Sequence, residues 1–307
     1  MATNLQWHGY MKSIGAAASA GLWGGMMQAV PTTGTAEGWR ASLALGFRHD
    51  GARTVLARRS AYGPLQVQRP FYPEGDVCHV YLLHPPGGIV GGDRLEIAAE
   101  IEAGAHALLT TPAAGKFYRS AGRSAEQWQR FAVADGAALE WFPQETVVFD
   151  GARARNVTRV ELAPGARFIG WEIVCLGRTA SGERYGNGLF VQGMEVYRQG
   201  RPIFLERNHF DGGGAVLDAP WGLSGWPVTG TLVCAGADES DLTAVRDALG
   251  EDEADELTGA TLLGEVLLAR YVGSVAERAR ERFIRVWEAL RPRKFGRPAQ
   301  QPRIWST

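Results

Sequence analysis

Four glutamates in apolar surroundings are the first candidates for chemistry in this chain. They are Glu140 before Trp141-Phe142, Glu145 before Thr146-Val147-Val148, Glu172 between Trp171 and Ile173, and Glu206 after Phe204-Leu205. A carboxylate among aromatic side chains costs free energy unless it is paired or functional. For each residue, a salt bridge to one of the arginines is the alternative. Together the four indicate an acid-lined interior path for a cation, because carboxylates bind divalent ions, although a transition metal normally prefers added nitrogen or sulfur ligands.

The sequence offers no self-contained catalytic constellation beside these acids. The segment Thr111–Phe117 resembles the end of a phosphate-binding loop, but Thr110 stands where the leading glycine is needed and Phe117 replaces the magnesium-binding Ser or Thr. Cys78 and His84 share strand parity, yet six residues of extended chain separate them by roughly 20 Å. We therefore expect neither nucleotide hydrolysis nor a simple chelating pair.

Composition limits the classes of protein that remain. The 307 residues are 45% hydrophobic and 21% charged, which is ordinary for a soluble globular protein. The net charge of −1 gives no general attraction to nucleic acid or to anionic lipid. Three cysteines without short spacing indicate a reducing compartment, hence a cytoplasmic location. No apolar stretch is long enough to span a bilayer.

The first 37 residues differ from the rest of the chain. Lys12 precedes an Ala-, Gly- and Met-rich run at 14–30 that imitates a signal peptide. Ser19, Gln28 and several glycines interrupt this run, so we expect a flexible N-terminal extension over residues 1–37 rather than an export signal. The remainder, 38–307, is expected to form a single β-rich domain.

The segment His84–Asp93 is the most unusual loop of the sequence. It contains two prolines, which fix the chain after an apolar run, and four glycines, which permit backbone angles closed to other residues. Asp93 at its end is its one acid. The simplest interpretation is an unusual connection between strands. We favour a loop that makes a close backbone contact or forms a binding surface.

A repeat of about 30 residues predicts the fold class. Three turn sequences, Ala103-Gly104-Ala105, Asp135-Gly136-Ala137 and Pro164-Gly165-Ala166, each join two strand-like runs, and their glycines lie 32 and 29 residues apart. In the run Leu95–Ile101 every second residue is apolar, and Glu96 and Glu100 lie between these positions, as in a half-buried strand. Strand–turn–strand units at this period indicate a mainly β protein with β-helix-like stacked strands, a solenoid. A chance coincidence of common turn residues is the alternative.

Further strands and then helices are expected towards the C-terminus. The strand candidates are Leu189–Tyr197, Pro202–Leu205 and Gly230–Cys234. After these strands the spacing of apolar residues changes, and they recur at helical spacing over 240–249 and 257–290. These C-terminal helices, at about 240–290, are expected to stop at Pro292.

The last segment, 291–307, is a basic tail. It contains Lys294, Arg297 and Arg303 together with the aromatic residues Phe295 and Trp305. A solvated tail is one interpretation. Aromatic residues in a basic, otherwise polar tail favour the other, an arm that uses Phe295 and Trp305 to dock on a partner.

Several motifs together resemble the UreD (also called UreH) family of urease accessory proteins. They are Tyr62–Gly75, His84–Asp93, Thr110–Ser120, Phe142-Pro143-Gln144-Glu145 and Leu205-Glu206-Arg207-Asn208. The motifs occur in family-like order and spacing, and the likeness runs from about Trp39 to the basic tail. The first 37 residues have no counterpart in it.

The resemblance implies a non-enzymatic chaperone or scaffold for urease maturation. Members of the family bind urease apoprotein, and with UreF and the GTPase UreG they deliver nickel, so nickel would be in transit rather than a stable cofactor. The implied fold is a β-helix-like stack with helices near the C-terminus, whose helices and tail would dock UreF. The family's nickel path maps by motif onto Asp93, Glu145 and Glu206, whereas Glu140 and Glu172 are added from their local sequence alone.

Two other functions stay open at this point. Ten tryptophans and the group Glu140, Glu145 and Glu172 are compatible with a β-solenoid hydrolase acting on carbohydrate, which needs two carboxylates in an open cleft. A stand-alone nickel store would need several nitrogen or sulfur ligands close together, and the spacings above do not provide them.

Overall fold

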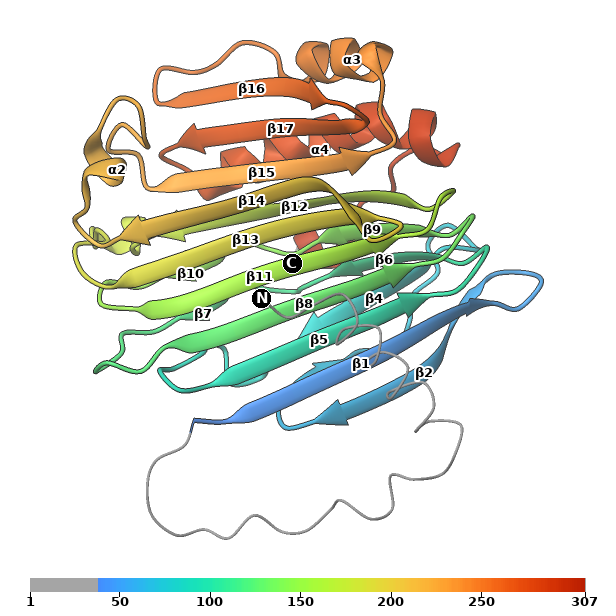
Figure 1. Cartoon of the computed structure of the whole chain (residues 1–307), viewed down its shortest axis with the longest axis horizontal. Helices are drawn as coiled ribbons and strands as arrows, with labels where there is room; N and C mark the ends of the chain where they lie inside the picture. Colours follow the sequence, from blue (N-terminus) through green and yellow to red (C-terminus); the bar gives the residue numbers. More distant parts are fainter. Residues whose placement is uncertain (1–37, 307) are drawn as a thin grey trace, which may run out of the picture. The chain divides into compact units, whose positions relative to one another are not determined.

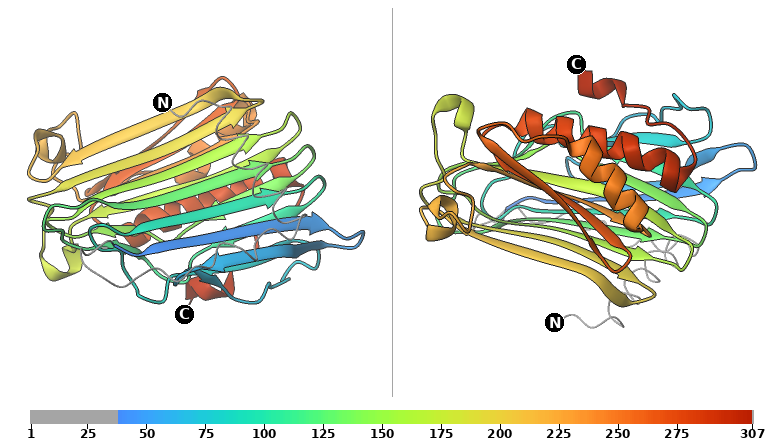
Figure 2. Two further views of the ribbon diagram at one scale, coloured as in Figure 1. Left: turned by 60° about the horizontal axis from the view of Figure 1, so that its bottom comes forward. Right: turned by 90° about the horizontal axis from the view of Figure 1, so that it is seen from above.

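The computed structural model describes residues 38–306 of the chain. The expected N-terminal extension at 1–37 lies outside the described residues. In the described part, two large β-sheets face each other, and the helices α3 (Glu239–Leu249) and α4 (Ala276–Phe295) lie on the outer side of one of them (Figures 1 and 2). None of these helices is both long enough and apolar enough to cross a membrane.

The first sheet has seven strands. In spatial order they are β14 (Arg201–Asp211), β13 (Leu189–Arg198), β11 (Arg153–Leu162), β8 (Ala125–Val133), β5 (Arg94–Ile101), β1 (Arg40–His49) and β2 (Thr54–Tyr62). The five strands from β13 to β1 are mutually parallel, and β14 and β2 are added antiparallel at the two edges.

The second sheet is built on a parallel centre in the same way. Its main order is β16 (Glu256–Leu263), β17 (Val266–Gly273), β15 (Val228–Ala235), β12 (Arg167–Leu176), β9 (Ala138–Phe142), β6 (His106–Thr110), β4 (Cys78–Leu83) and β3 (Gln66–Val67). Two short strands, β7 (Gly115–Phe117) and β10 (Thr146–Val148), pair in parallel beside β12. The strands β12, β9, β6 and β4 are parallel, and β15, β17 and β16 continue the sheet antiparallel.

The chain passes alternately through the two sheets, and the predicted β-solenoid is confirmed. It runs from β5 to β6, from β8 to β9 and from β11 to β12, so each unit places one strand in each sheet. His106 of one unit pairs with Ala138, which pairs with Arg167, so the register repeats the 32- and 29-residue spacing of the turn glycines. Gly104 and Gly136 adopt φ values of 73° and 68°, the left-handed region that glycine enters without strain.

The loop His84–Asp93 belongs to this stack, and the close backbone contact expected of it is present. Ile89 forms a parallel bridge with Phe117 of β7. The Asp93 carboxylate accepts hydrogen bonds from the backbone N–H of Trp39 at 2.7 Å and of Val90 at 3.0 Å. A Cβ atom on Gly38 would lie 2.0 Å from the carbonyl carbon of Gly92, so the two backbones touch. Asp93 thus fixes the entry to β1.

Apolar side chains fill two layers, one on each face of the second sheet. Between the sheets lie large side chains such as Phe47, Phe131, Trp141, Phe168 and Phe190. On the outer face, α4 (Ala276–Phe295) and α3 (Glu239–Leu249) cover the sheet with a second set that includes Phe283, Trp287 and Leu290. The short elements η2 (Thr179–Ser181), α2 (Ala215–Asp218) and η3 (Arg303–Ser306) complete the fold.

One part of the helix prediction is wrong. Residues 256–273 form the hairpin β16–β17, not a helix, while α3 and α4 confirm the helices at either side of it. In β16 buried or half-buried residues alternate with exposed ones along its whole length, which is the period of a strand. Gly264 takes a φ of 60° at the turn. Pro292 lies inside α4, which ends one turn later at Gly296.

Close packing between the stacked strands leaves no room for a side chain at Gly170 of β12. A Cβ at this position would approach the carbonyl oxygen of Trp141 to 2.9 Å and the Phe168 ring to 2.9 Å. We expect Gly170→Ala to lower the free energy of unfolding by about 1–3 kcal/mol, because overpacked cores force backbone shifts. Urea denaturation followed by tryptophan fluorescence measures the change.

Gly259→Ala is the matched control, since Gly259 also lies in a strand but a Cβ atom there would meet no neighbouring atom within 4 Å. It should be neutral or slightly stabilising. Equal stabilities for the two variants would contradict the tight packing inferred at Gly170.

Candidate functional site

Glu140 occupies a fully buried site on the outer face of the second sheet, beneath α4, where it contacts Trp287 and Arg291 of that helix. Its two carboxylate oxygens accept hydrogen bonds from His106 Nε2 at 2.7 Å, Trp287 Nε1 at 2.6 Å and the Arg291 guanidinium at 2.9–3.1 Å. Burial alone would raise the pKa of Glu140, but His106 and Arg291 outweigh it and lower the pKa to about 2. The pairing contributes stability that is present above pH 4.5 and is lost as pH falls towards 2.

Arg291 extends this cluster to a second carboxylate. It is fully buried and donates to both oxygens of Glu74, at 2.7 and 2.8 Å, and Glu74 also contacts His79 Nε2 at 2.7 Å. Arg297 adds a two-pronged pair with Asp76 at 2.7 and 2.8 Å. The C-terminal part of α4 is therefore tied to the segment before β4. This geometry favours the salt-bridge alternative for Glu140.

A second set of polar side chains, buried except for the half-buried Asn208 and the exposed Arg270, lies between the two sheets, and we call it the polar file. Its members project inward from seven strands and are Gln129, Asn156, Thr158, Glu172, Gln192, Glu206, Asn208, Thr231 and Arg270. Hydrogen bonds connect the first part of it in series. Gln129 contacts Asn156 at 3.0 Å and Thr158 at 3.4 Å, and Thr158 donates to Glu172.

Glu172 stands at the centre of the polar file and is only 4% exposed. Gln192 donates to its second oxygen at 2.9 Å and is in turn contacted by Asn208 at 3.4 Å. These partners are neutral. Burial therefore dominates, and with the nearby charge of Glu206 it raises the pKa of Glu172 to about 7, although Thr158 and Gln192 partly oppose the shift.

Glu206 marks the end of the polar file that reaches solvent. It is buried, but it pairs with Arg270, whose side chain is 48% exposed. Arg270 also contacts the Thr231 hydroxyl at 3.3 Å. The polar file therefore runs from an exposed guanidinium between β14 and β17 to Gln129 deep in the stack, and its interior side chains present carboxylate, amide and hydroxyl oxygens.

The structure brings two of the five predicted acids, Glu172 and Glu206, into one polar file and places the other three elsewhere. Glu140 lies on the opposite face of the second sheet, under α4. Asp93 holds the backbone at the start of β1. Glu145 pairs with Arg280 of α4 at 3.2 Å. A role of these three acids in cation passage stays a prediction. Across residues 38–306, no group of three or more His, Cys, Asp or Glu side chains is arranged to hold a metal ion.

The amide and hydroxyl members of the polar file were missed from the sequence, although a signal for them exists. Gln129 shares strand parity with buried Phe131, and Asn156 and Thr158 share parity with buried Val160. A polar residue at an inward position of an alternating strand must find a buried partner. Lining up such positions by the 30-residue repeat would have placed them beside one another.

The basic tail is packed on its own chain, so Phe295 is not exposed as the predicted docking arm would require, and a partner contact of the half-buried Trp305 stays a prediction. Phe295 is 6% exposed and stacks on His106 with ring centroids 5.4 Å apart. Trp305 is half-buried, donates to the Thr110 hydroxyl at 2.9 Å and lies 5.5 Å from the Trp171 ring. In this arrangement Phe295 has no surface to offer a partner.

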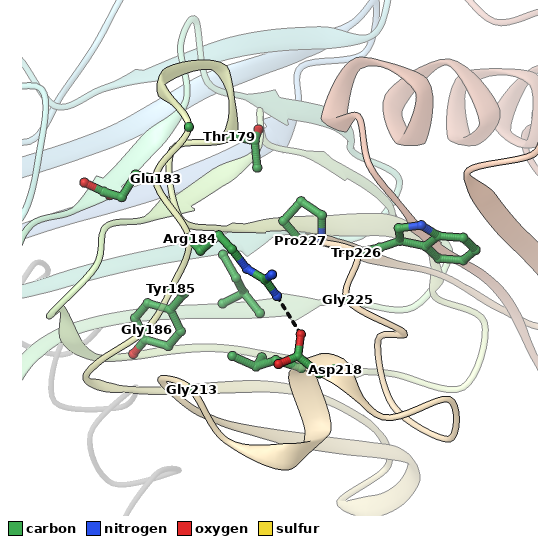
Figure 3. A pocket seen from close by; sticks show the side chains of 13 residues that line it. Thr179, Glu183, Arg184, Tyr185, Gly186, Gly213, Asp218, Gly225, Trp226 and Pro227 are labelled. Carbon is green, nitrogen blue, oxygen red and sulfur yellow. Dashed lines mark hydrogen bonds and ion pairs between the residues drawn. The ribbon is translucent and has the colours of Figure 1, made fainter.

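The carbohydrate hydrolase alternative is not favoured. Glu140 and Glu172 are 0% and 4% exposed and lie on opposite faces of a sheet, so they flank no open cleft. A cavity of about 410 Å³ near α2 does have two acids, Glu183 and Asp218, in its wall (Figure 3). Both are ion-paired, and the hydrogen bond from Arg178 lowers the pKa of Glu183, whereas a glycosidase acid needs a raised one.

The Arg291 cluster predicts a large effect on stability. Arg291→Met would leave Glu74 and Glu140 buried without their main cation, and we expect a loss of about 3–5 kcal/mol in the free energy of unfolding at neutral pH. Arg184→Met is the control, because its pair with Asp218 is exposed on both sides and should be worth at most about 1 kcal/mol. Urea denaturation measures the free energy of unfolding of both variants. A comparable loss in the two would contradict a large contribution of the buried ion pairs of Arg291.

The raised pKa of Glu172 makes its contribution to the free energy of unfolding change with pH in the opposite direction to that of Glu140. Between pH 4.5 and about 7 the unfolded chain has released this proton while the folded chain retains it. The contribution of Glu172 therefore lowers the free energy of unfolding as pH rises through that window, by about 1.4 kcal/mol per unit.

The isosteric variant Glu172→Gln carries no such proton. It should match the wild-type protein at about pH 4 and be more stable than it above about pH 7, as thermal melts across this range would measure. The exposed Glu251→Gln should show no pH-dependent difference. A Glu172→Gln variant that is less stable than wild type at every pH would contradict the assignment.

Comparison with known proteins places the chain in a family. The family model described as UreD urease accessory protein matches residues 40–306. Urease accessory protein UreD of Azoarcus sp. (strain BH72) is 53% identical over 273 residues, covering 88% of this chain and 95% of that protein. The UreD proteins of Dechloromonas aromatica and Methylobacillus flagellatus are 50% and 46% identical, each with 88% of this chain and 95% of the relative covered. The chain belongs to the UreD family of urease accessory proteins.

Proposed function

We propose that this protein is a non-enzymatic scaffold that assists nickel loading of urease. The family match over residues 40–306 is the observation that carries the proposal, because the relatives are themselves named as urease accessory proteins. The expected partners are urease apoprotein, UreF and the GTPase UreG. Nucleotide chemistry is assigned to UreG, and a cytoplasmic location accords with the three free cysteines of this chain.

Within this role, the polar file is the proposed route for nickel. A cation that passes through a protein needs sites that attract it but release it again. The polar file offers two carboxylates, Glu206 near the surface and Glu172 in the interior, with amide and hydroxyl oxygens around them. Oxygen ligands alone bind nickel less firmly than imidazole or thiolate does, which suits transit rather than storage.

The experiment compares urease matured in cells with and without this chain. A urease operon is co-expressed with wild-type protein, with no protein, or with a variant, and nickel per purified urease and urea hydrolysis are measured. The protein should restore both quantities. Equal nickel and activity with and without it would contradict the maturation role itself.

The double variant Glu172→Gln/Glu206→Gln tests the route separately from the role. We expect it to lower nickel per urease at least about fivefold, because it removes both carboxyl groups of the polar file and leaves the shape of the polar file unchanged. Glu251→Gln is the control at an exposed acid. Thermal melts confirm folding, and a pull-down with urease and UreF measures partner binding. Full nickel loading by the double variant would contradict the route and leave the scaffold role standing.

A further inference from the structure

A cation-rich pocket lies at the turn end of the stack, away from the polar file. Its volume is about 340 Å³, and it opens widely to solvent. Five segments form its wall: residues 164–167, which lead into β12, Arg198 at the end of β13, the junction after β15, Glu265 between β16 and β17, and the end of α4. Segments far apart in the sequence thus converge on one small surface.

Positive charge is concentrated at this pocket. The charged side chains in its wall are four cations, Arg167, Arg198, Arg293 and Lys294, and one carboxylate, Glu265. Asp241 lies behind two of the cations and is the next carboxylate in contact with them. Asp238 lies near the same two cations and Asp135 accepts a hydrogen bond from Gly165 in the wall, so these acids offset much of the positive charge, and Arg167 is the wall cation that no carboxylate of residues 38–306 pairs with.

Three of the four cations also serve the fold. Arg198 pairs with Glu265 at 2.9 Å and donates to the carbonyl oxygens of Ala163 and Pro164. Arg293 contacts Asp241 at 2.6 Å, and Lys294 shares the same carboxylate. Cations in the last turn of a helix also interact favourably with the helix dipole, so Arg293 and Lys294 alone would not indicate a ligand.

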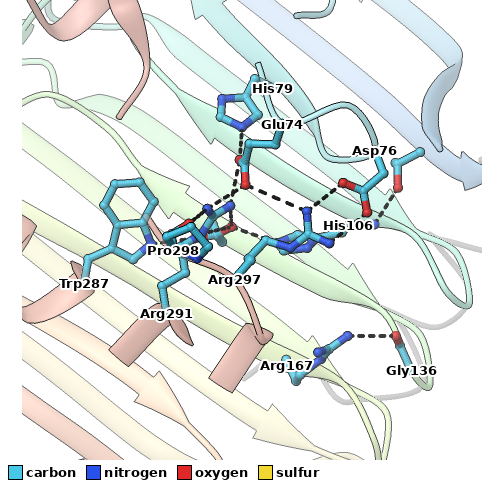
Figure 4. Close-up of polar contacts among 12 residues, drawn as sticks. Glu74, Asp76, His79, His106, Gly136, Arg167, Trp287, Arg291, Arg297 and Pro298 are labelled. Carbon is cyan, nitrogen blue, oxygen red and sulfur yellow. Dashed lines mark hydrogen bonds and ion pairs between the residues drawn. The ribbon is translucent and has the colours of Figure 1, made fainter. Parts of the chain in front are cut away.

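Arg167 differs from these three cations, because its guanidinium forms no ion pair within residues 38–306. It is exposed, no carboxylate of residues 38–306 pairs with it, and its one hydrogen bond, to the Gly136 carbonyl, is 3.4 Å long (Figure 4). Its guanidinium carbon lies 5.8 Å from the centre of the Phe295 ring, and Phe295 is buried. The ring supports the side chain beside the other three cations and leaves most of its N–H donors available.

We propose that this pocket is an anchor for acidic side chains of a partner protein. The Arg167 guanidinium presents paired donors that match a carboxylate, and the three neighbouring cations give a docked acidic side chain further favourable contacts. A small free anion would remain largely hydrated in so open a pocket, whereas acidic side chains on a docked protein are held there by the rest of the interface. The site is independent of the nickel route, since it uses none of the residues of the polar file.

The test uses the full-length protein and a labelled, N-acetylated and C-amidated hexaglutamate peptide as the probe, with fluorescence anisotropy as the readout. We expect saturable binding that weakens as salt is raised, because exposed charges are screened. Arg167→Glu should weaken binding about tenfold. Arg155→Glu is the matched control, an exposed arginine on the outer face of β11, and should change binding less than about twofold.

Three outcomes would overturn the proposal. The first is no binding of the peptide by the wild-type protein, and the second is an equal loss of binding in the two variants. The third is displacement of the labelled peptide by inorganic phosphate at the same molar concentration as unlabelled peptide, with the ionic strength matched. The last would identify a free-oxyanion site instead of a protein anchor. Thermal melts of both variants exclude unfolding, and Arg167→Gln should give an intermediate loss if charge is the cause.

Discussion

The fold depends on the rule that polar groups inside a solenoid must be satisfied by the neighbouring strands of the stack. The parallel register places Ala138 beside His106 and Arg167, so every inward position has a defined neighbour above and below it. A buried side chain such as Asn156 has no water to bond, and its partner must come from the next unit, as Gln129 does. The side chains of the polar file therefore enter the core as a connected set, whereas Trp141 Nε1 is buried between the sheets without a hydrogen-bond partner.

Two buried glutamates show how the partners decide the chemistry of a group. Glu140 and Glu172 are equally out of contact with bulk water, yet the pKa of one is lowered to about 2 and that of the other is raised to about 7. Glu140 has a guanidinium and a histidine against it, whereas Glu172 has a hydroxyl, an amide and the charge of another carboxylate. The first glutamate is a structural anion. The second is a carboxyl whose charge the protein does not neutralise.

Local patterns in the sequence predicted what depends on local physics. The turn glycines, the alternation of Leu95–Ile101 and the Gly-rich loop ending at Asp93 each correspond to a structural feature. The helix predicted over residues 256–273 is wrong, because the leucines there recur at spacings compatible with either a helix or a strand. Pairing of β17 with β15, a contact distant in the sequence, selects the strand. The sequence of the basic tail predicts a docking arm at Phe295 and Trp305, because it contains no signal for their contacts with the His106 and Trp171 rings, which are distant in the sequence.

The division of polar groups between the two faces of the second sheet explains how the interior can tolerate Glu172. Natural proteins violate the rules of core packing at sites of function and compensate elsewhere. Here β12 carries Trp171 on the face towards α4 and Glu172 on the face towards the first sheet. On the α4 side, Arg291 joins two carboxylates and aromatic rings pack closely, so that layer supplies stability. A strand held firmly on one face can keep an uncompensated carboxyl on the other, and this is the interior carboxyl that the proposed nickel route would use.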